Sequence, residues 1–297
     1  MTSRNYEVFR FDGELGACSG WTYKPRSSEG GSTYLPFEGL FPDKGGRIQS
    51  EIFDLLGPGY YKLTFSASSE MRCFWWLDFF DSDGKNLPDC NSLVKESGQM
   101  VAYEEFFYVS GLVKKAQVAF VSKDKIRVRD IRIIPVNAED AATWCDKIYG
   151  NLPPLGFSAP SDSMKLLPKT SLALNKGNCW RVVMLGDSIM NDSYNSVFQA
   201  LVKRSFPVSN IEFVISVRGA TGCWYYGEQE QFDKYVSVYK PDLLMIGGVN
   251  NFPSGTIDEL QAVVDVIDKA RSQIGCEIAL LSQPLAQDWR KNEKGTL

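Results

Sequence analysis

The chain has 297 residues, with 32 basic and 36 acidic side chains, a formal net charge of −4 and no histidine. Hydrophobic residues make up 44% of the chain and charged residues 23%, which is ordinary for a globular protein and excludes a disordered or collagen-like chain. The mild acidity argues against a nucleic-acid partner, which would require clustered Lys and Arg. Without histidine, this chain alone has no Ser-His dyad and no histidine-ligated metal.

Seven cysteines are scattered without a C-x-x-C pair, so we expect buried free thiols rather than a disulfide framework or a zinc ribbon. The segment Met1–Tyr6 lacks the apolar region of a signal peptide. No stretch approaches the ~18 apolar residues that span a bilayer. We therefore expect a soluble chain without a membrane span, a metal or an organic cofactor.

Residues 1–136 show the pattern of an all-β domain. Apolar and polar residues alternate over 60–68, 116–121 and 126–134, and turn residues such as Gly57-Pro58-Gly59 separate such runs. Several short strands joined by loops predict a β-sandwich or jelly roll. In the last run the apolar phase shifts around Asp130, which predicts a β-bulge.

The pattern of residues 137–178 predicts a helix followed by a linker. Residues 137–149 carry an apolar stripe at helical spacing, and Asn151-Leu152-Pro153-Pro154 ends it. The stretch 156–177 is rich in Ser, Pro, Lys and Gly, which is typical of an interdomain connection.

Residues 179–297 alternate between strand and helix patterns. Four apolar runs are continuous, as in a parallel sheet covered on both faces, and they are 181–185, 211–217, 243–246 and 277–281. Alternating strands and helices predict a layered α/β domain with right-handed crossovers.

Helices are expected between these strands because apolar residues recur there at helical spacing. The first two stripes consist of Tyr194, Val197, Phe198 and Leu201, and of Phe232, Tyr235, Val236 and Tyr239. The third helix is expected to begin with a capping box, Thr256-x-x-Glu259, and to bury Leu260, Val263, Val264 and Ile267.

Three loops that follow predicted strands contain residues suited to acyl transfer. The carboxyl ends of parallel strands gather reactive groups at one edge. Ser188 follows the first strand at a strand-to-helix turn, where the helix N-terminus favours developing negative charge. A tetrahedral oxyanion needs two or three donors, and the backbone amides of Ser188 and Gly222 with the side chain of Asn250 would provide them.

Each of these residues also has an ordinary structural interpretation. Asp187-Ser188 would cap a helix, Gly219 and Gly222 would serve a tight turn, and Asn250 or Asn251 would be a turn asparagine. The combination in this order, after successive strands, favours the catalytic interpretation.

The three loops resemble the sequence blocks of the SGNH (GDSL) hydrolase superfamily over about the last 120 residues. Gly186-Asp187-Ser188 is similar to the block with the nucleophile, and residues 218–222 to the block whose last glycine donates to the oxyanion. Residues 248–251 are similar to the G-x-N-D block, with Asn251 in place of Asp, so Asn250 and Asn251 both remain candidates for the third donor.

This resemblance implies a three-layer, flavodoxin-like α/β domain over residues 179–297. It also implies a serine esterase that hydrolyses O-acyl esters without a cofactor. The implied catalytic residues are Ser188 as nucleophile, with Gly222 and Asn250 as oxyanion donors.

The D-x-x-H block of that family, which supplies the catalytic Asp and His, is absent. The predicted parallel sheet also ends one strand and one helix short. We therefore expect little activity from this chain alone, because loss of the triad histidine costs several orders of magnitude in rate. The two interpretations are a fragment whose catalytic His lies outside this chain and a natural pseudoenzyme. The family is often exported, but the thiols suit a reducing cytoplasm equally well, and the oligomeric state is open.

The N-terminal domain resembles jelly-roll carbohydrate-binding modules over residues 59–65, 81–84 and 128–133. The cluster Phe74-Trp75-Trp76 with Phe79 and Phe80 is a candidate platform for sugar stacking, although alternation along a strand places at least half of it in the core. Asp81-x-Asp83-Gly84 resembles the start of a calcium loop but lacks the later ligands, so we expect a hairpin turn.

The appended sandwich indicates an acylated carbohydrate as the ester substrate, with acetyl as the expected acyl group. The alternatives are a non-catalytic glycan-binding protein and a lipid acylhydrolase. A glycan-binding protein would bind sugar without turnover, and the two hydrolases would differ in the acyl chain length they accept.

Overall fold

The structure is a computed structural model that describes residues 7–14, 21–25, 35–36, 46–123, 126–152, 162–247 and 258–281. It divides into two compact units. The first unit consists of Met1–Phe157 and Asp192–Pro207, and the second of Ser158–Asn191 and Val208–Leu297. In the part of the chain described, no helix is long and apolar enough to cross a membrane.

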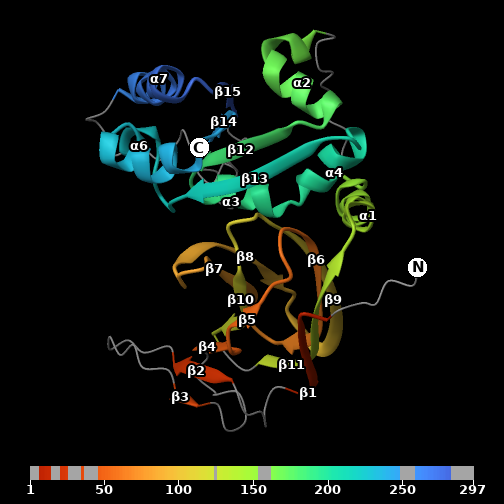
Figure 1. Cartoon of the computed structure of the whole chain (residues 1–297). Coiled ribbons are helices and arrows are strands. Elements are labelled where there is room, and N and C mark those ends of the chain that lie inside the picture. Colours follow the sequence, from red (N-terminus) through yellow and green to blue (C-terminus); the bar gives the residue numbers. More distant parts are fainter. Residues whose placement is uncertain are drawn as a thin grey trace, which may run out of the picture. The chain divides into compact units, whose positions relative to one another are not determined.

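The first unit contains an antiparallel β-sandwich, as predicted (Figure 1). Its four-stranded sheet, sheet A, has the order β1 (Phe9–Glu14), β11 (Ile126–Val136), β6 (Gly59–Ser69) and β9 (Ser97–Val109). Its seven-stranded sheet, sheet B, has the order β3 (Leu35–Pro36), β2 (Thr22–Pro25), β4 (Gly46–Gln49), β10 (Lys115–Ser122), β7 (Cys73–Phe80) and β8 (Asn86–Val94), with β5 (Phe53–Asp54) paired to β10.

Strict alternation of apolar residues builds the sandwich core. The alternation predicted over 60–68 is confirmed, since Leu63, Phe65 and Ala67 of β6 are buried in the core. Phe120 of β10 faces them from sheet B. The predicted bulge is confirmed, because the pairing of β11 with β6 shifts register between Arg129 and Arg132 and Asp130 has a φ of 54°.

Two helices belong to the first unit. The predicted helix is confirmed as α1 (Ala138–Tyr149), and its N-cap Asn137 accepts a hydrogen bond from the Asp140 amide at 2.8 Å. Its apolar face packs against α4 (Phe198–Ser205) in a buried cluster with Phe106 of β9. The first compact unit therefore extends past residue 136. It also includes Asp192–Pro207, which follow the strand Cys179–Gly186 of the second unit.

The single helix expected over residues 194–201 is wrong. The segment forms α3 (Ser188–Asn195) and α4, separated at Val197, whose φ of 62° is left-handed. Val197 is fully buried in the cluster with α1, so tertiary packing holds a conformation that local propensity opposes.

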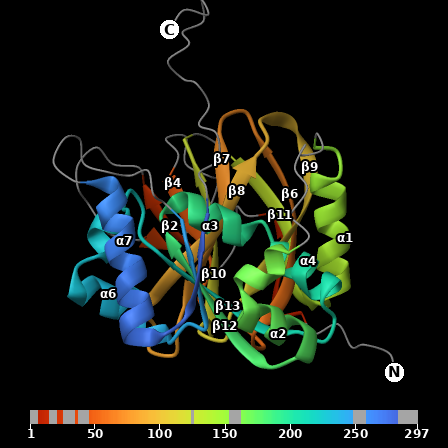
Figure 2. The same cartoon turned by 90° about the horizontal axis from the view of Figure 1, so that it is seen from above.

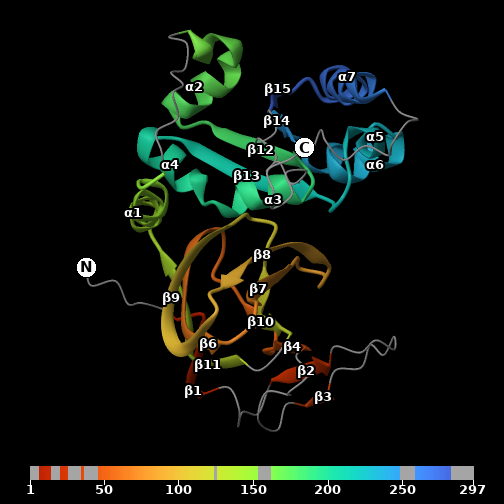
Figure 3. The same cartoon turned by 180° about the vertical axis from the view of Figure 1, so that it is seen from behind.

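The second unit is built on a parallel sheet, sheet C (Figures 2 and 3). Its order is β13 (Asn210–Val217), β12 (Cys179–Gly186), β14 (Leu243–Ile246) and β15 (Glu277–Leu280), and every pair is parallel, as predicted. The chain thus passes from β12 to one neighbour and then crosses to the other side. This order is that of a flavodoxin-like sheet.

Helices α2 (Pro168–Lys176) and α7 (Glu259–Lys269) lie on the same face of sheet C (Figures 1 and 3). Part of the predicted connection over 156–177 is instead helical, with a 3₁₀ turn at Ser163–Leu166 and α2 at Pro168–Lys176. The sequence carried the signal for α2, since Pro168 opens the helix and Gly177 ends it in the left-handed region at a φ of 74°.

Short helical segments connect β13 to β14. They are α5 (Cys223–Tyr226), α6 (Gln229–Tyr235) and a 3₁₀ turn at Ser237–Tyr239. After α7 the chain continues through a π-helical turn, Ala270–Ile274, into β15.

The predicted start of α7 is wrong, and of its predicted buried face Val263 is confirmed whereas Leu260 and Val264 are not. Its N-cap is Asp258, which accepts a hydrogen bond from the Gln261 amide at 3.0 Å, so the helix begins after Thr256. Leu260 and Val264 are exposed, whereas Ala262, Val263 and Val266 are buried. Apolar residues occur on more than one face of this helix, and the packing of α5 against it determines which face is buried.

The prediction of mostly buried free thiols is confirmed, since five of the six described cysteines are buried. Cys73, Cys90, Cys145, Cys223 and Cys276 are free and buried, and Cys179 is free and exposed.

Candidate functional site

Ser188 lies at the carboxyl end of β12, where it opens α3. Its side chain is exposed, whereas Asp187 beside it is fully buried. The Asp187 carboxylate accepts a hydrogen bond from the Ile189 amide at 2.9 Å, so Asp187 caps the first turn of the helix. The capping role that was the alternative for Asp187-Ser188 therefore belongs to Asp187.

Tyr226 ties the loop after β13 to the end of β12. Its hydroxyl donates to the Gly186 carbonyl at 2.6 Å and accepts from the Arg218 amide at 3.0 Å. The Arg218 amide also lies 3.2 Å from the Gly186 carbonyl. Burial raises the pKa of Tyr226, so its hydroxyl remains a protonated donor. Sequence reasoning missed this residue, whose only signal is the aromatic run Trp224-Tyr225-Tyr226.

Gly222 is the N-cap of α5 and is buried. Its backbone is extended, with a φ of −140°, and its carbonyl accepts from the Tyr225 amide at 3.0 Å. The left-handed residue of this loop is Ala220, at a φ of 55°. Gly222 and Ser188 thus follow neighbouring parallel strands, whose last paired residues are Val217 and Gly186.

The carboxyl ends of β12 and β14 approach each other closely. The Gly247 amide donates to the Leu185 carbonyl at 2.8 Å, and a Cβ on Gly186 would lie 3.0 Å from the Gly247 carbonyl carbon. From β12 the chain continues to β13 on one side of it and later crosses to β14 on the other side. The carboxyl end of β12 is therefore a topological switch point, where open α/β sheets bind ligands. Asn250 and Asn251 lie outside the described residues.

The aromatic cluster of β7 divides between the two faces of sheet B. Trp75 and Phe79 are buried in the sandwich core, whereas Phe74 and Trp76 are half-buried on the opposite face, which we call the outer face. The expectation that at least half of the cluster is core is confirmed. Phe80 is also buried.

The segment Asp81–Gly84 forms the expected hairpin turn between β7 and β8. The Asp81 carboxylate accepts from the amides of Asp83 and Lys85, each at 2.9 Å, and Gly84 has a left-handed φ of 78°. Asp81 is thus engaged in the turn itself.

Side chains on the outer face lie in rows across the sheet, because the strand register places paired residues next to one another. Phe74 is paired with Val121 of β10, which is paired with Arg47 of β4, which is paired with Lys24 of β2. The next row along the strands consists of Trp76, Ala119, Gln49 and Thr22.

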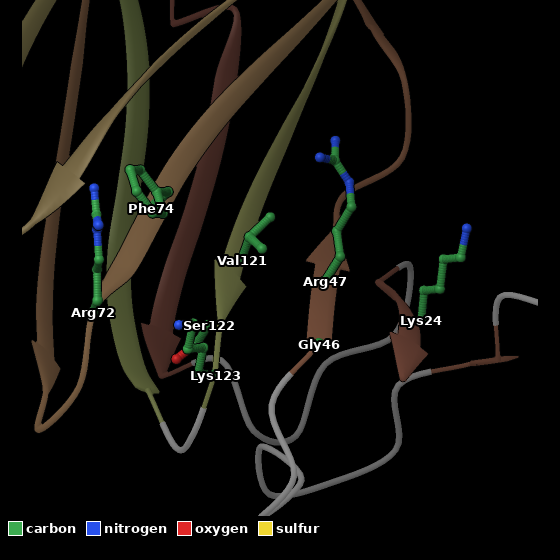
Figure 4. Close-up of a pocket in the computed structure, with 8 residues that line it drawn as sticks. All are labelled: Lys24, Gly46, Arg47, Arg72, Phe74, Val121, Ser122 and Lys123. Carbon is green, nitrogen blue, oxygen red and sulfur yellow. The ribbon is translucent and has the colours of Figure 1, made fainter. Parts of the chain in front are cut away.

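A groove of about 390 Å³ opens at the first of these rows (Figure 4). It is lined by Lys24, Gly46, Arg47, Arg72, Phe74, Val121, Ser122 and Lys123. Glycine is required at position 46, because its φ is +153° and a Cβ there would lie 2.5 Å from the Lys24 carbonyl oxygen.

Guanidinium groups lie over both aromatic rings of the outer face. The Arg72 guanidinium is 5.0 Å from the ring centroid of Phe74, and that of Arg47 is 5.8 Å from the centroid of Trp76. Arg47 also forms an ion pair with Asp78. The Trp76 indole N–H is buried without a hydrogen-bond partner among the described residues.

No protein-family model and no curated protein matches the sequence, so the SGNH resemblance stands on its three loops alone. Among solved structures, the chain is similar to a carbohydrate-binding module of Cellvibrio mixtus lichenase 5A in complex with cellotriose, at 14% identity over 44% of this chain and 100% of that chain, with a TM-score of 0.28. It is similar to the CBM22-1 xylan-binding domain of Paenibacillus barcinonensis Xyn10C, at 8% identity over 46% and 99% of the two chains, with a TM-score of 0.30. It also matches 19% of the bacteriophage CBA120 tailspike protein 4 enzymatically active domain, at 13% identity over 41% of this chain and a TM-score of 0.30.

Proposed function

We propose that the first unit binds carbohydrate through the outer face of sheet B. The observation that carries this proposal is the alignment of two aromatic rings, Phe74 and Trp76, beside a groove whose neighbouring positions carry polar side chains. A sugar ring presents an apolar face of C–H groups and an edge of hydroxyls. Aromatic rings suit the first, and fixed donors and acceptors suit the second.

The dimensions of the groove are consistent with this use. Small-molecule sites in proteins span about 300–1,000 Å³, and this groove lies within that range. Val121 forms a low apolar floor between Phe74 and Arg47. In the adjoining row Asn91 is paired with Trp76, and Gln49 follows on the far side of Ala119.

The test is binding of the full chain to a panel of soluble oligosaccharides by calorimetry. Trp76→Ala and Phe74→Ala are each expected to weaken binding about tenfold, since one aromatic contact contributes about 0.5–1.5 kcal/mol beyond its buried area. Leu56→Ala, at an exposed apolar position away from the groove, is the control. Retention of full affinity in both aromatic variants would exclude this face as the binding site.

We propose as a second function that the second unit hydrolyses O-acyl esters at Ser188, with an acetylated carbohydrate as substrate. The observation that favours it is an exposed serine at the start of α3, at the switch point of sheet C, with the capping role taken by Asp187. The Ser188 hydroxyl would attack the acyl carbon while a base accepts its proton. The oxyanion would be held by the amide of Gly222 and the side chain of Asn250.

The rest of the reaction follows from the same groups. The alcohol would leave with a proton returned by the base, and water would then hydrolyse the acyl-serine and regenerate Ser188. The chain contains no histidine to act as that base. An imidazole added in solution can take this role, which makes the proposal testable on the chain as it exists.

The experiment measures hydrolysis of p-nitrophenyl acetate with and without imidazole. Ser188→Ala defines the background, and only a chain with Ser188 should show an imidazole-dependent excess and an acetylated serine by mass spectrometry. Asn250→Ala should reduce that excess by about 10²–10³, the typical effect of losing one oxyanion donor. A larger loss from Asn251→Ala would move the donor to that residue.

Two outcomes separate the alternatives. Equal rates for the chain and Ser188→Ala would favour a non-catalytic glycan-binding protein. Faster turnover of long acyl chains than of acetate would indicate a lipid acylhydrolase instead of a carbohydrate esterase.

A further inference from the structure

The groove on the outer face is strongly cationic. Four of its eight lining residues are Lys24, Arg47, Arg72 and Lys123, and none of the eight is acidic. The chain as a whole carries a net charge of −4, so this concentration of positive charge is local. A groove for neutral ligands has no need of it.

The cations flank the groove from both sides (Figure 4). Arg72 precedes β7 and Lys123 follows β10, next to the paired strand ends Cys73 and Ser122. Lys24 and Arg47 are paired on β2 and β4. Three strand spacings separate β2 from β7, which is about 14 Å across the sheet and long enough for a short oligosaccharide.

Two of these cations have no carboxylate to neutralise them among the described residues. Arg72 and Lys123 are exposed, form no ion pair there, and Arg72 rests on the Phe74 ring instead. A guanidinium over a ring still directs its N–H donors along its own plane, where a carboxylate or sulfate can accept two hydrogen bonds. The same site therefore combines an aromatic surface with N–H donors that can bind an anion.

From this arrangement we propose that the groove selects acidic carbohydrates, glycans whose sugar rings carry carboxylate or sulfate groups. The proposal rests on the proposed carbohydrate binding and names its ligand class. The sugar ring would contact Phe74 over Val121, while its anionic substituents meet Arg72 and Lys123 on one flank and Lys24 and Arg47 on the other. A nucleic acid is disfavoured, because it would need cations along an extended surface of a chain that is acidic overall.

The test compares matched ligands on the full chain. Oligogalacturonate is compared with the same oligomer after reduction of its carboxylates to alcohols, and a sulfated glycan with its desulfated form. We expect at least tenfold tighter binding of the acidic member of one pair at 150 mM salt, with affinity falling as salt increases. The pair that shows the preference identifies the anionic group.

Variants locate the effect. Arg72→Gln and Lys123→Gln should each lower affinity for the acidic ligand severalfold, and by a larger factor than they lower affinity for the reduced ligand. Lys85→Gln, an exposed cation at the β7–β8 turn, is the control that should change neither. Melting curves exclude loss of fold in each variant.

The outcomes distinguish the two proposals. Equal binding of acidic and neutral members would overturn the acidic preference and leave carbohydrate binding standing. Absence of binding to every glycan would overturn both. Binding of single-stranded DNA as tight as that of the acidic glycan would overturn carbohydrate selection in favour of general polyanion binding.

Discussion

Glu105 is a half-buried acid in the β-sandwich. It lies on β9 opposite Leu63 of β6, and no described residue forms an ion pair with it. Burial raises its pKa to about 7, because the surrounding protein solvates a carboxylate less well than water does. Between about pH 5 and pH 7 the folded chain therefore retains a proton on this group that the unfolded chain has lost.

This proton makes stability depend on pH. Because the folded pKa lies above the unfolded value of about 4.3, the favourable contribution of this group is complete below that value and is lost as pH rises through 7. In Glu105→Gln the side chain cannot ionise, so its melting temperature relative to the native chain should rise between pH 5 and pH 8. Melting curves at four pH values check this, with Glu96→Gln at an exposed position as control. A difference that stays constant with pH would contradict it.

At the scale of elements, the carboxyl end of sheet C depends on the close approach of the backbones that follow β12 and β14. β12 ends at Gly186 and β14 is followed by Gly247, and the chain turns from Gly186 into α3 with Met190 packed against both glycines. A Cβ on Gly186 would lie 2.9 Å from the Met190 Cβ and 3.0 Å from the Gly247 backbone. The glycine that precedes Asp187-Ser188 is therefore required by packing.

Gly186→Ala should destabilise the second unit by about 1–3 kcal/mol, the usual cost of overpacking a well-packed site. Urea unfolding measures it. Gly219→Ala is the matched control in the neighbouring loop, since a Cβ there would meet nothing within 4 Å. A Gly186→Ala variant as stable as Gly219→Ala would contradict this prediction, because it would show that the backbone at the end of β12 can shift to admit a Cβ without loss of stability.

At the scale of the whole molecule, the two units are interleaved along the chain. After β12, residues 192–207 return to the first unit, where Val197 and Ala200 pack on α1. Trp144 of α1 holds this cluster, since its ring stacks on Phe106 at 5.4 Å and its indole N–H donates to the Glu104 carbonyl at 3.2 Å. The stability of α4 should therefore follow that of the sandwich.

Trp144→Ala is expected to cost the first unit about 3–5 kcal/mol, as for other buried aromatic truncations. Hydrogen exchange should show lost protection in Phe198–Ser205, with protection in β12 and β14 retained. Ile148→Ala, at an exposed position on the same helix, is the control. Unchanged exchange in α4 would contradict its assignment to the first unit.

The sequence by itself determined three strands of the sandwich, β6, β10 and β11, and the four strands of sheet C, because periodicity is a local property. Alternation in β6 and β7 and continuous apolar runs in β12 and β14 follow from which faces are buried. It also indicated the loop with Ser188, because strand ends and helix starts have local signals. The helix α2 was missed although Pro168 and Gly177 marked its ends.

Only the tertiary structure decided which neighbours cover each element. Leu260 and Val263 are both apolar, yet only Val263 is covered, because the position of α5 is not encoded within α7. Val197 takes a left-handed conformation because burial against α1 outweighs its local cost. The cationic groove unites Lys24, Arg47 and Arg72 with Lys123, since strand register, which depends on contacts distant in sequence, aligns β2, β4, β10 and β7.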